Sequence, residues 1–272
     1  MADGGTRQGR KHKAKSHFDK KASAAMTRHL AKPAWSLRQK LALTARMLAR
    51  EDHESALAGQ ITARGGKKGT MWTARFGLGL DEIRASDFLL VDGDLNVLEG
   101  DGMPNPSNRF HLWIYRARPD VNCVVHTHPP YCSALGMTGK PLIAAHMDTA
   151  MFYEDCAWLS KWPGPPIGDE EGELISTALG DKNSILLAHH GQLAAAPSVE
   201  EAAVRSLFIE RAARMQLMAM AAGGVRKVEA KYGRQAHDYR LKKAPLDATF
   251  HYFARRALQE APDCLEEYDE RA

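Results

Sequence analysis

Two short apolar segments that each end in histidine constrain this chain more than any other feature. The first, residues 120–130, reads DVNCVVHTHPP, and the second, residues 184–191, reads SILLAHHG. The paired valines of the first segment favour a buried strand, and residues i and i+2 of a strand share a face. His126 and His128 are then roughly 7 Å apart at Cα, given a rise of roughly 3.3 Å per residue. Two neutral imidazoles at this spacing can hold a divalent cation, and core packing or hydrogen bonding is the alternative use of such a pair.

The second segment supplies a third histidine. Of the adjacent pair His189 and His190, one side chain faces inward from a strand and the other faces away. Gly191 permits a tight backbone turn where a third ligand must approach. We therefore predict that His190 joins the metal site, and that His189 packs or supports the ligands from outside the site. Three histidines with one open position are typical of a catalytic zinc site rather than a structural one.

Length and composition predict one α/β domain with appended tails. The chain has 272 residues, of which 44% are hydrophobic, and we place the domain at 33–272 with a C-terminal extension from about residue 225. The sequence has neither the roughly 18 consecutive apolar residues of a membrane span nor the apolar segment of a signal peptide. The four cysteines show no C-x-x-C spacing, which predicts a reducing, cytoplasmic setting.

The basic charge is concentrated at the N-terminus. Residues 1–32 carry nine Lys or Arg and two Asp, a net +7, so the other 240 residues carry −3 of the total +4. High charge with few apolar residues predicts that 1–32 is a disordered basic tail. A nucleic-acid arm is the alternative, but Phe18 is the only aromatic residue there, and we do not expect a nucleic-acid or membrane partner.

Periodicity predicts the elements around the two histidine segments. Capping boxes at Ser36 and Ser198 begin helices, alternating segments predict strands and a hairpin, and i, i+3, i+4 spacing predicts the remaining helices. The expected helices span residues 37–51, 106–118, 129–135, 198–222 and 250–258. The expected strands span residues 59–64, 71–76, 88–91 and 95–98. Residues 139–166 are expected to form a loop rich in polar and aromatic groups.

These segments together resemble the class II aldolase/adducin family. The resemblance rests on 110–111, 118–128, 186–191 and 198–202, in the family's order, and covers roughly 36–224. Residues 76–87 and 152–155 are most similar to the adducin-like branch.

The resemblance implies a three-layer αβα fold around a mainly antiparallel sheet. It also implies a homotetramer with sites at subunit interfaces and a small-molecule substrate. Carried over residue by residue, His126, His128 and His190 match the family's metal ligands. The metal is expected to be zinc, with manganese or cobalt as alternatives.

A divalent ion held by three neutral imidazoles keeps its full charge, and it can stabilise an enediolate or enolate as a bond next to a carbonyl breaks. We therefore expect a metal-dependent carbon–carbon lyase, an aldolase or a decarboxylase. An epimerase or dehydratase on the same metal site is an alternative, because both also pass through enolates. An adducin-like binding module without chemistry is another, although such a module has no physical need of three histidines.

Three positions depart from the sugar-phosphate aldolases of this family. Ser107 stands where they have an acid/base glutamate, and a hydroxyl is a poor proton acceptor at neutral pH. Gly59-Gln60 replaces their phosphate-binding Gly-Asn, and Met147 lies near their tyrosine acid. The substrate is therefore expected to be a small hydroxy- or oxo-acid without phosphate.

Other side chains are candidates for the missing roles. His111, Asp148 and Glu154 are candidate acid/base residues, with packing, capping or solvation as the alternatives. Candidate substrate-binding groups, for which structural ion pairs or hydrogen bonds are the alternative use, are Arg75, Arg109, Ser107 and Gln60.

Overall fold

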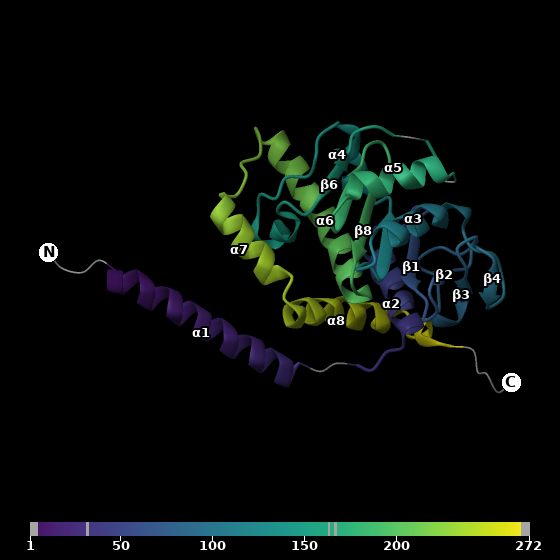
Figure 1. Cartoon of the computed structure of the whole chain (residues 1–272), viewed down its shortest axis with the longest axis horizontal. Coiled ribbons are helices and arrows are strands. Elements are labelled where there is room, and N and C mark those ends of the chain that lie inside the picture. The colour runs from purple at the N-terminus through teal and green to yellow at the C-terminus, as the bar shows by residue number, and fades with distance from the viewer. Residues whose placement is uncertain (1–4, 31–32, 163, 166–167, 268–272) are drawn as a thin grey trace.

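The chain forms a central sheet covered by helices on both faces, as Figure 1 shows. The computed structural model describes residues 5–30, 33–162, 164–165 and 168–267. The strands are β1 Gln60–Arg64, β2 Met71–Ala74, β3 Phe88–Val91, β4 Val97–Glu99, β5 Cys123–Thr127, β6 Ala157–Leu159, β7 Ser184–Leu187 and β8 Gln192–Ala196. The α-helices are α1 Gly5–His29, α2 Leu37–Arg50, α3 Arg109–Ala117, α4 Pro130–Met137, α5 Asp169–Leu179, α6 Val199–Ala221, α7 Ala230–Arg240 and α8 Lys243–Glu260. Short 3-10 turns are η1 Ala85–Asp87, η2 Pro106–Asn108, η3 Met147–Phe152 and η4 Pro262–Leu265.

The sheet is mainly antiparallel, as predicted. Its strand order is β4-β3-β2-β1-β5-β8-β7-β6. Within the described residues, β6 and β7 form the one parallel pair, and the other pairings are antiparallel. The predicted hairpin is the β3–β4 pair. β5 lies between β1 and β8, so the segment with the first two histidines occupies the middle of the sheet.

Two apolar cores hold the three layers together. On one face, Phe110 and Ile114 of α3 pack with Val124 of β5 and with α5. On the other face, α2, α6 and α8 pack over the alternate β5 side chains, including Val125. Successive β5 residues point to opposite faces, and both faces are covered, which explains why the whole strand is buried. The predicted αβα fold is thus confirmed.

Of the two predicted capping boxes, the one at α2 is complete, and at α6 the bond to the Ser198 hydroxyl is the half that forms. The Ser36 hydroxyl accepts a hydrogen bond from the Gln39 amide, and the Gln39 side chain accepts one from the Ser36 amide, which completes a capping box at α2. At α6 the Ser198 hydroxyl accepts from the Glu201 amide. These bonds satisfy amide groups that a helix start leaves without partners.

The described parts of residues 139–162 and of the C-terminal extension contain more regular structure than predicted. Strand β6 lies within 139–166, because its three residues complete the edge of the sheet beside β7. In the extension, α8 includes the predicted helix 250–258, and its Phe250, Ala254 and Ala257 are buried in the same core as α2 and α6. The role and the boundaries of the extension stay predictions.

The N-terminal segment differs from the predicted disorder, because residues 5–29 form α1. Residues 10–28 contain neither Gly nor Pro and are rich in Lys and Ala, which favour helix without tertiary packing. Figure 1 shows α1 extending away from the body, with one end near α8. There Lys242 pairs with Asp19, and no α1 side chain from residue 17 onward is buried.

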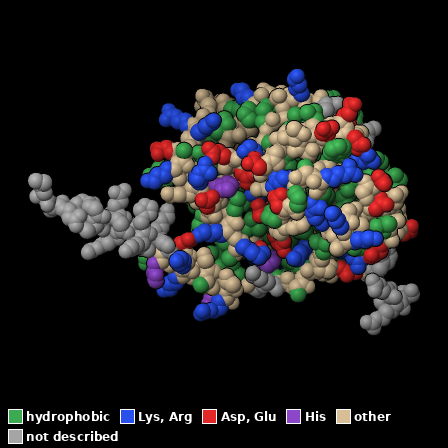
Figure 2. All heavy atoms as spheres, in the orientation of Figure 1, with side chains coloured by type: hydrophobic (Ala, Val, Ile, Leu, Met, Phe, Trp, Pro, Cys, Tyr) green, Lys and Arg blue, Asp and Glu red, His purple; other side chains and the backbone are tan. Residues whose placement is uncertain are grey.

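The surface of the body mixes both signs of charge on the face that Figure 2 shows. None of the helices in the described ranges has the length and apolar run that a membrane crossing requires.

Candidate metal centre

His126 and His128 converge at the end of β5. His126 is almost fully buried and lies opposite Gln60 of β1 and Leu193 of β8. His128 follows the strand by one residue and is partly exposed. The two ring centroids are 4.8 Å apart, and the two Nε2 atoms are 2.9 Å apart.

The turn between β7 and β8 brings the third histidine. The Leu187 amide donates to the Gly191 carbonyl at 2.9 Å, and the His190 amide donates to the Leu187 carbonyl at 3.3 Å. The His190 ring centroid is 4.7 Å from that of His126 and 4.6 Å from that of His128.

His189 takes the left-handed backbone conformation in this turn, with φ 54°, and its side chain is exposed. Its side chain is therefore not packed against the described residues, contrary to the packing part of the expectation. As predicted for the pair, the side chain that turns inward is that of His190.

The geometry and chemistry of the three rings fit a divalent cation. One nitrogen from each ring lies within 4.8 Å of the others, and ligand atoms of a tetrahedral zinc ion are roughly 3.3 Å apart for bonds of about 2.0–2.1 Å. His126 Nδ1 donates to the Gln192 carbonyl at 2.8 Å, so its Nε2 carries the lone pair that faces the other rings.

All three imidazole rings are neutral near pH 7, because their pKa values are lowered. Burial lowers the pKa of His126 well below its usual value and lowers that of His128. Burial and the neighbouring His128 lower the pKa of His190 to about 4. Neutral imidazole is the form that binds metal, so no proton has to leave near pH 7.

His111 is buried beside this centre on the α3 face. Its Nδ1 is 2.8 Å from the Thr62 hydroxyl, which is 2.9 Å from the Tyr115 hydroxyl. Burial lowers the pKa of His111 to about 3, so the ring is neutral and cannot donate an excess proton at pH 7. Its Nε2 has no hydrogen-bond partner among the residues described. An acid/base role for His111 stays a prediction.

The two candidate arginines are held in ion pairs. Arg75 Nε donates to Asp87 Oδ1 at 2.8 Å. Arg109 Nη2 donates to Asp169 Oδ1 at 2.5 Å, and the Trp113 indole donates to the same oxygen, which ties α3 to α5. These contacts match the structural ion pairs that Sequence analysis gave as the alternative to substrate binding.

The candidate carboxylates also have partners elsewhere. Asp148 pairs with Arg211 of α6 at 3.2 Å. Glu154 is exposed and pairs with Arg234 of α7. Its neighbour Asp155 accepts from the Asn183 amide, just before β7, whereas His190 follows the end of β7. The length of β7, roughly 13 Å for its four residues, therefore separates the Glu154–Asp155 segment from the turn that carries His190.

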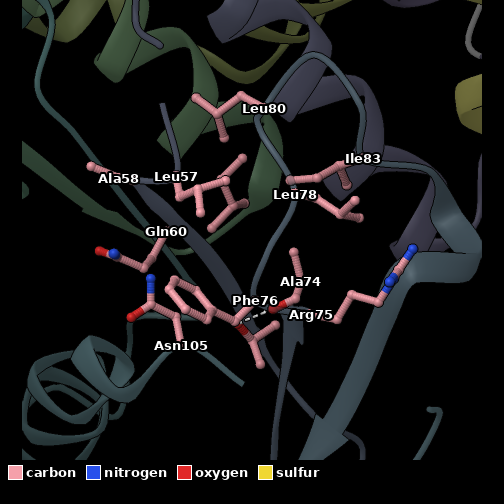
Figure 3. Close-up of a pocket in the computed structure, with 13 residues that line it drawn as sticks. Leu57, Ala58, Gln60, Ala74, Arg75, Phe76, Leu78, Leu80, Ile83 and Asn105 are labelled. Atoms are coloured by element: carbon pink, nitrogen blue, oxygen red, sulfur yellow. Dashed lines mark hydrogen bonds between the residues drawn. The ribbon is translucent and has the colours of Figure 1, made fainter. Parts of the chain in front are cut away.

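Ser107 and Gln60 differ in their surroundings. Ser107 is in η2, where its amide donates to the Asn105 side chain at 3.0 Å. Gln60 is buried opposite His126 and lines a small pocket with Asn105 (Figure 3).

Sequence reasoning missed the residues that support the centre. The Gln192 side chain donates to the Thr127 hydroxyl at 2.7 Å, and that hydroxyl is 2.8 Å from Nδ1 of buried His53. Gln192 orients His126 through its backbone carbonyl. Every residue has this group, so the identity of residue 192 could not predict the role. His53 is 74 residues from Thr127 in the chain, and no spacing rule connects them.

Comparison with known proteins identifies the family. The family model of the class II aldolase and adducin N-terminal domain matches residues 39–217. The chain therefore belongs to the class II aldolase and adducin family. Its assignment to the adducin-like branch stays a prediction.

Relatives of known activity include both a decarboxylase and an aldolase. The chain is 32% identical over 203 residues to 3,4-dihydroxyphthalate decarboxylase of Arthrobacter keyseri, which covers 70% of this chain and 81% of that protein. It is 27% identical over 187 residues to the meiotically up-regulated gene 14 protein of Schizosaccharomyces pombe. That match covers 68% of this chain and 72% of that protein. The solved structure of L-fuculose 1-phosphate aldolase from Glaciozyma antarctica PI12 superposes on this chain with a TM-score of 0.78 at 25% sequence identity. The superposition covers 90% of this chain and 99% of that one.

Proposed function

We propose that this protein is a metal-dependent carbon–carbon lyase, an aldolase or decarboxylase, acting on a small hydroxy- or oxo-acid without phosphate. The observation that carries the proposal is the convergence of His126, His128 and His190 from two distant segments. Similarity to one named decarboxylase and one named aldolase supports a lyase.

The three histidines would hold one divalent cation, with zinc first and manganese or cobalt as alternatives. When bound, such a cation supplies Lewis acidity that stabilises negative charge on a substrate oxygen as the carbon–carbon bond breaks. The Gln192 carbonyl keeps the His126 proton on Nδ1, so the ligating nitrogen stays free. Phe110 packs edge-on against the His126 ring, with centroids 5.1 Å apart, and restricts its rotation.

The residue at position 107 favours decarboxylation over aldol cleavage. Ser107 is a poor base, and aldol cleavage has to remove a hydroxyl proton. Decarboxylation starts from an acid that is already ionised at neutral pH, so it needs no base at that position. Within the lyase proposal, we therefore place decarboxylation first. Release of carbon dioxide rather than aldehyde from candidate acids would support this order.

The metal centre is tested by replacing one ligand. In His128→Ala we expect loss of bound metal with retention of the fold, because two imidazoles bind a divalent ion much more weakly than three. Elemental analysis of the purified protein measures this. His189→Ala is the matched control, since His189 is the exposed neighbour of a ligand and should keep the metal. Full metal content in His128→Ala would refute the site, and with it the enzymatic proposal.

We further propose a cytoplasmic homotetramer with sites at subunit interfaces. The four cysteines are free thiols, which is compatible with a reducing compartment. Light scattering on purified protein measures the assembly, and a monomeric mass would contradict the tetramer.

A further inference from the structure

Helix α4 connects two of the three histidines. It begins two residues after His128, and its Ser133 hydroxyl donates to the His190 carbonyl at 3.2 Å. Near its end, Gly136 packs so closely on the turn after β7 that a Cβ there would be 2.9 Å from the Leu187 carbonyl oxygen. The position of α4 therefore affects both His128 and His190.

The first turn of α4 has no cap of its own. Pro129, which precedes the helix, makes no side-chain cap, and Pro130 has no amide hydrogen. The Ser133 amide already donates to the Pro129 carbonyl at 3.0 Å. The donors that this helix start leaves free are thus the amides of Tyr131 and Cys132.

Both of these amides donate to one carboxylate of α6. Glu210 Oε1 accepts from the Tyr131 amide at 2.8 Å, and Oε2 accepts from the Cys132 amide at 2.7 Å. Its negative charge thus lies at the N-terminus of α4, where the helix dipole favours an anion. Glu210 is 8% exposed. Burial raises its pKa, and the two amide donors act against that rise, so they offset part of the cost of burying the carboxylate.

The helix that carries Glu210 is a firm support. Ile209 and Ala213, which flank Glu210 on α6, are fully buried in the core that lies under the sheet. Figure 1 shows α6 running along this face, and α4 packs against it. A carboxylate fixed on such a helix can hold the start of α4 in one place.

We infer that Glu210 is a positioning residue that fixes α4, and through α4 holds His128 and His190 at the spacing that a divalent cation requires. The inference rests on the proposed function, because it concerns the metal centre on which that function depends. Its two hydrogen bonds go to α4, so its effect on the histidines passes through the helix.

Glu210→Gln tests this role. The substitution keeps the size of the side chain but replaces one acceptor oxygen by an NH₂ group, so one α4 amide then faces another donor. We expect the affinity for zinc to fall about 10-fold, as when a supporting contact of a metal ligand is removed. Calorimetric titration of the metal-free protein with zinc measures this. The visible absorption of the cobalt-loaded protein should also change, because it reports the geometry of the ligands.

Glu201→Gln is the matched control on the same helix. Glu201 pairs with buried Arg205, so the substitution should lower the stability in urea. It lies in the first turn of α6, and β8 separates it from the turn that carries His190. The zinc affinity and the cobalt spectrum of this variant should therefore equal those of the wild type, which distinguishes positioning from a general loss of stability.

Glu210→Asp replaces the glutamine variant if that protein does not fold. It keeps the charge, but its shorter side chain reaches one amide at most, so the same two changes are expected. Wild-type affinity and spectrum in the Glu210 variant, or equal losses in the Glu201 control, would overturn the Glu210 inference alone. Wild-type protein that takes up no zinc, manganese or cobalt would overturn the proposed function, and the Glu210 inference with it.

Discussion

Gly191 occupies a position at the metal centre where no side chain fits. A Cβ there would be 2.4 Å from the Thr127 carbonyl oxygen and 2.8 Å from Cδ2 of His128. The turn that carries His190 therefore approaches β5 as closely as the backbone allows.

We expect Gly191→Ala to move this turn away from β5. The cost should be about 1–3 kcal/mol of unfolding free energy, as for other overpacked sites, together with reduced metal content. Urea denaturation and elemental analysis measure the two effects. Gly66→Ala is the control, because nothing lies within 4 Å of its Cβ position, and its effect should stay within about 0.5 kcal/mol. A fully stable, metal-loaded Gly191→Ala would show that the approach is not required.

His53 makes the stability of the fold depend on pH. Burial lowers its pKa to about 3, whereas an unfolded histidine titrates near pH 6.5. The unfolded state therefore binds the extra proton between these values. The free energy of unfolding should fall as the pH drops below about 6.5, by about 1.4 kcal/mol per unit for each such group. His111, with its pKa also near 3, acts in the same direction.

Replacing His53 should reduce this dependence. Between pH 7.5 and 5.0, metal-free His53→Gln should lose about 2 kcal/mol less stability than the wild type. Urea denaturation at the two pH values measures the difference. Equal losses in both proteins would mean that His53 is protonated in the folded state.

At the scale of elements, one buried arginine joins α6 to the segment before β6 and to α7. Arg205 is fully buried, and its Nε donates to Glu201 Oε1 at 2.8 Å. Its Nη2 lies 2.8 Å from Asp155 Oδ2, and the same oxygen is 3.4 Å from His237 Nε2 of α7. The hydrogen bond to Asp155 raises the pKa of His237, so the protonated ring is favoured in this cluster.

Asp155→Asn should be strongly destabilising, because it leaves the buried Arg205 charge with Glu201 as its remaining anionic partner. We expect a loss of about 3 kcal/mol, measured by urea denaturation. Asp120→Asn is the comparison. Asp120 also pairs with an arginine, Arg118, but its side chain is 60% exposed, and such a pair contributes at most about 1 kcal/mol. Similar losses in both variants would show that burial of the arginine does not set the cost.

At the scale of the whole molecule, α1 contributes little to the cores that surround the sheet. Among the described residues its main contact with the body is with α8, and its side chains from residue 17 onward are exposed or half-buried. Removing residues 1–30 should therefore leave activity unchanged and the melting temperature within about 2 °C of the full chain. A thermal melt and an assay of carbon dioxide or aldehyde release by the truncated protein test this. A large drop in either would mean that α1 packs in the assembled protein.

Much of the architecture and the identity of the three histidines could be predicted from local pattern. Alternation and periodicity act over a few residues, so they placed α2, α3 and α6 close to their observed bounds and indicated strands within 120–130 and 184–191, where β5 and β7 form. The His-x-His spacing alone put His126 and His128 on one side of a strand. The turn residue Gly191 then distinguished His190 from His189.

Tertiary structure decided which partner each polar side chain takes. Arg75 and Arg109 were equally plausible as substrate ligands until the fold placed Asp87 and Asp169 beside them. Gln60 was one candidate among several until β1 paired with β5 and left its oxygen buried opposite His126. A local pattern depends on neighbouring residues, so it can be recognised in the sequence. An ion pair or an unpaired acceptor depends on which distant segments pack together, and these segments meet only in the folded chain.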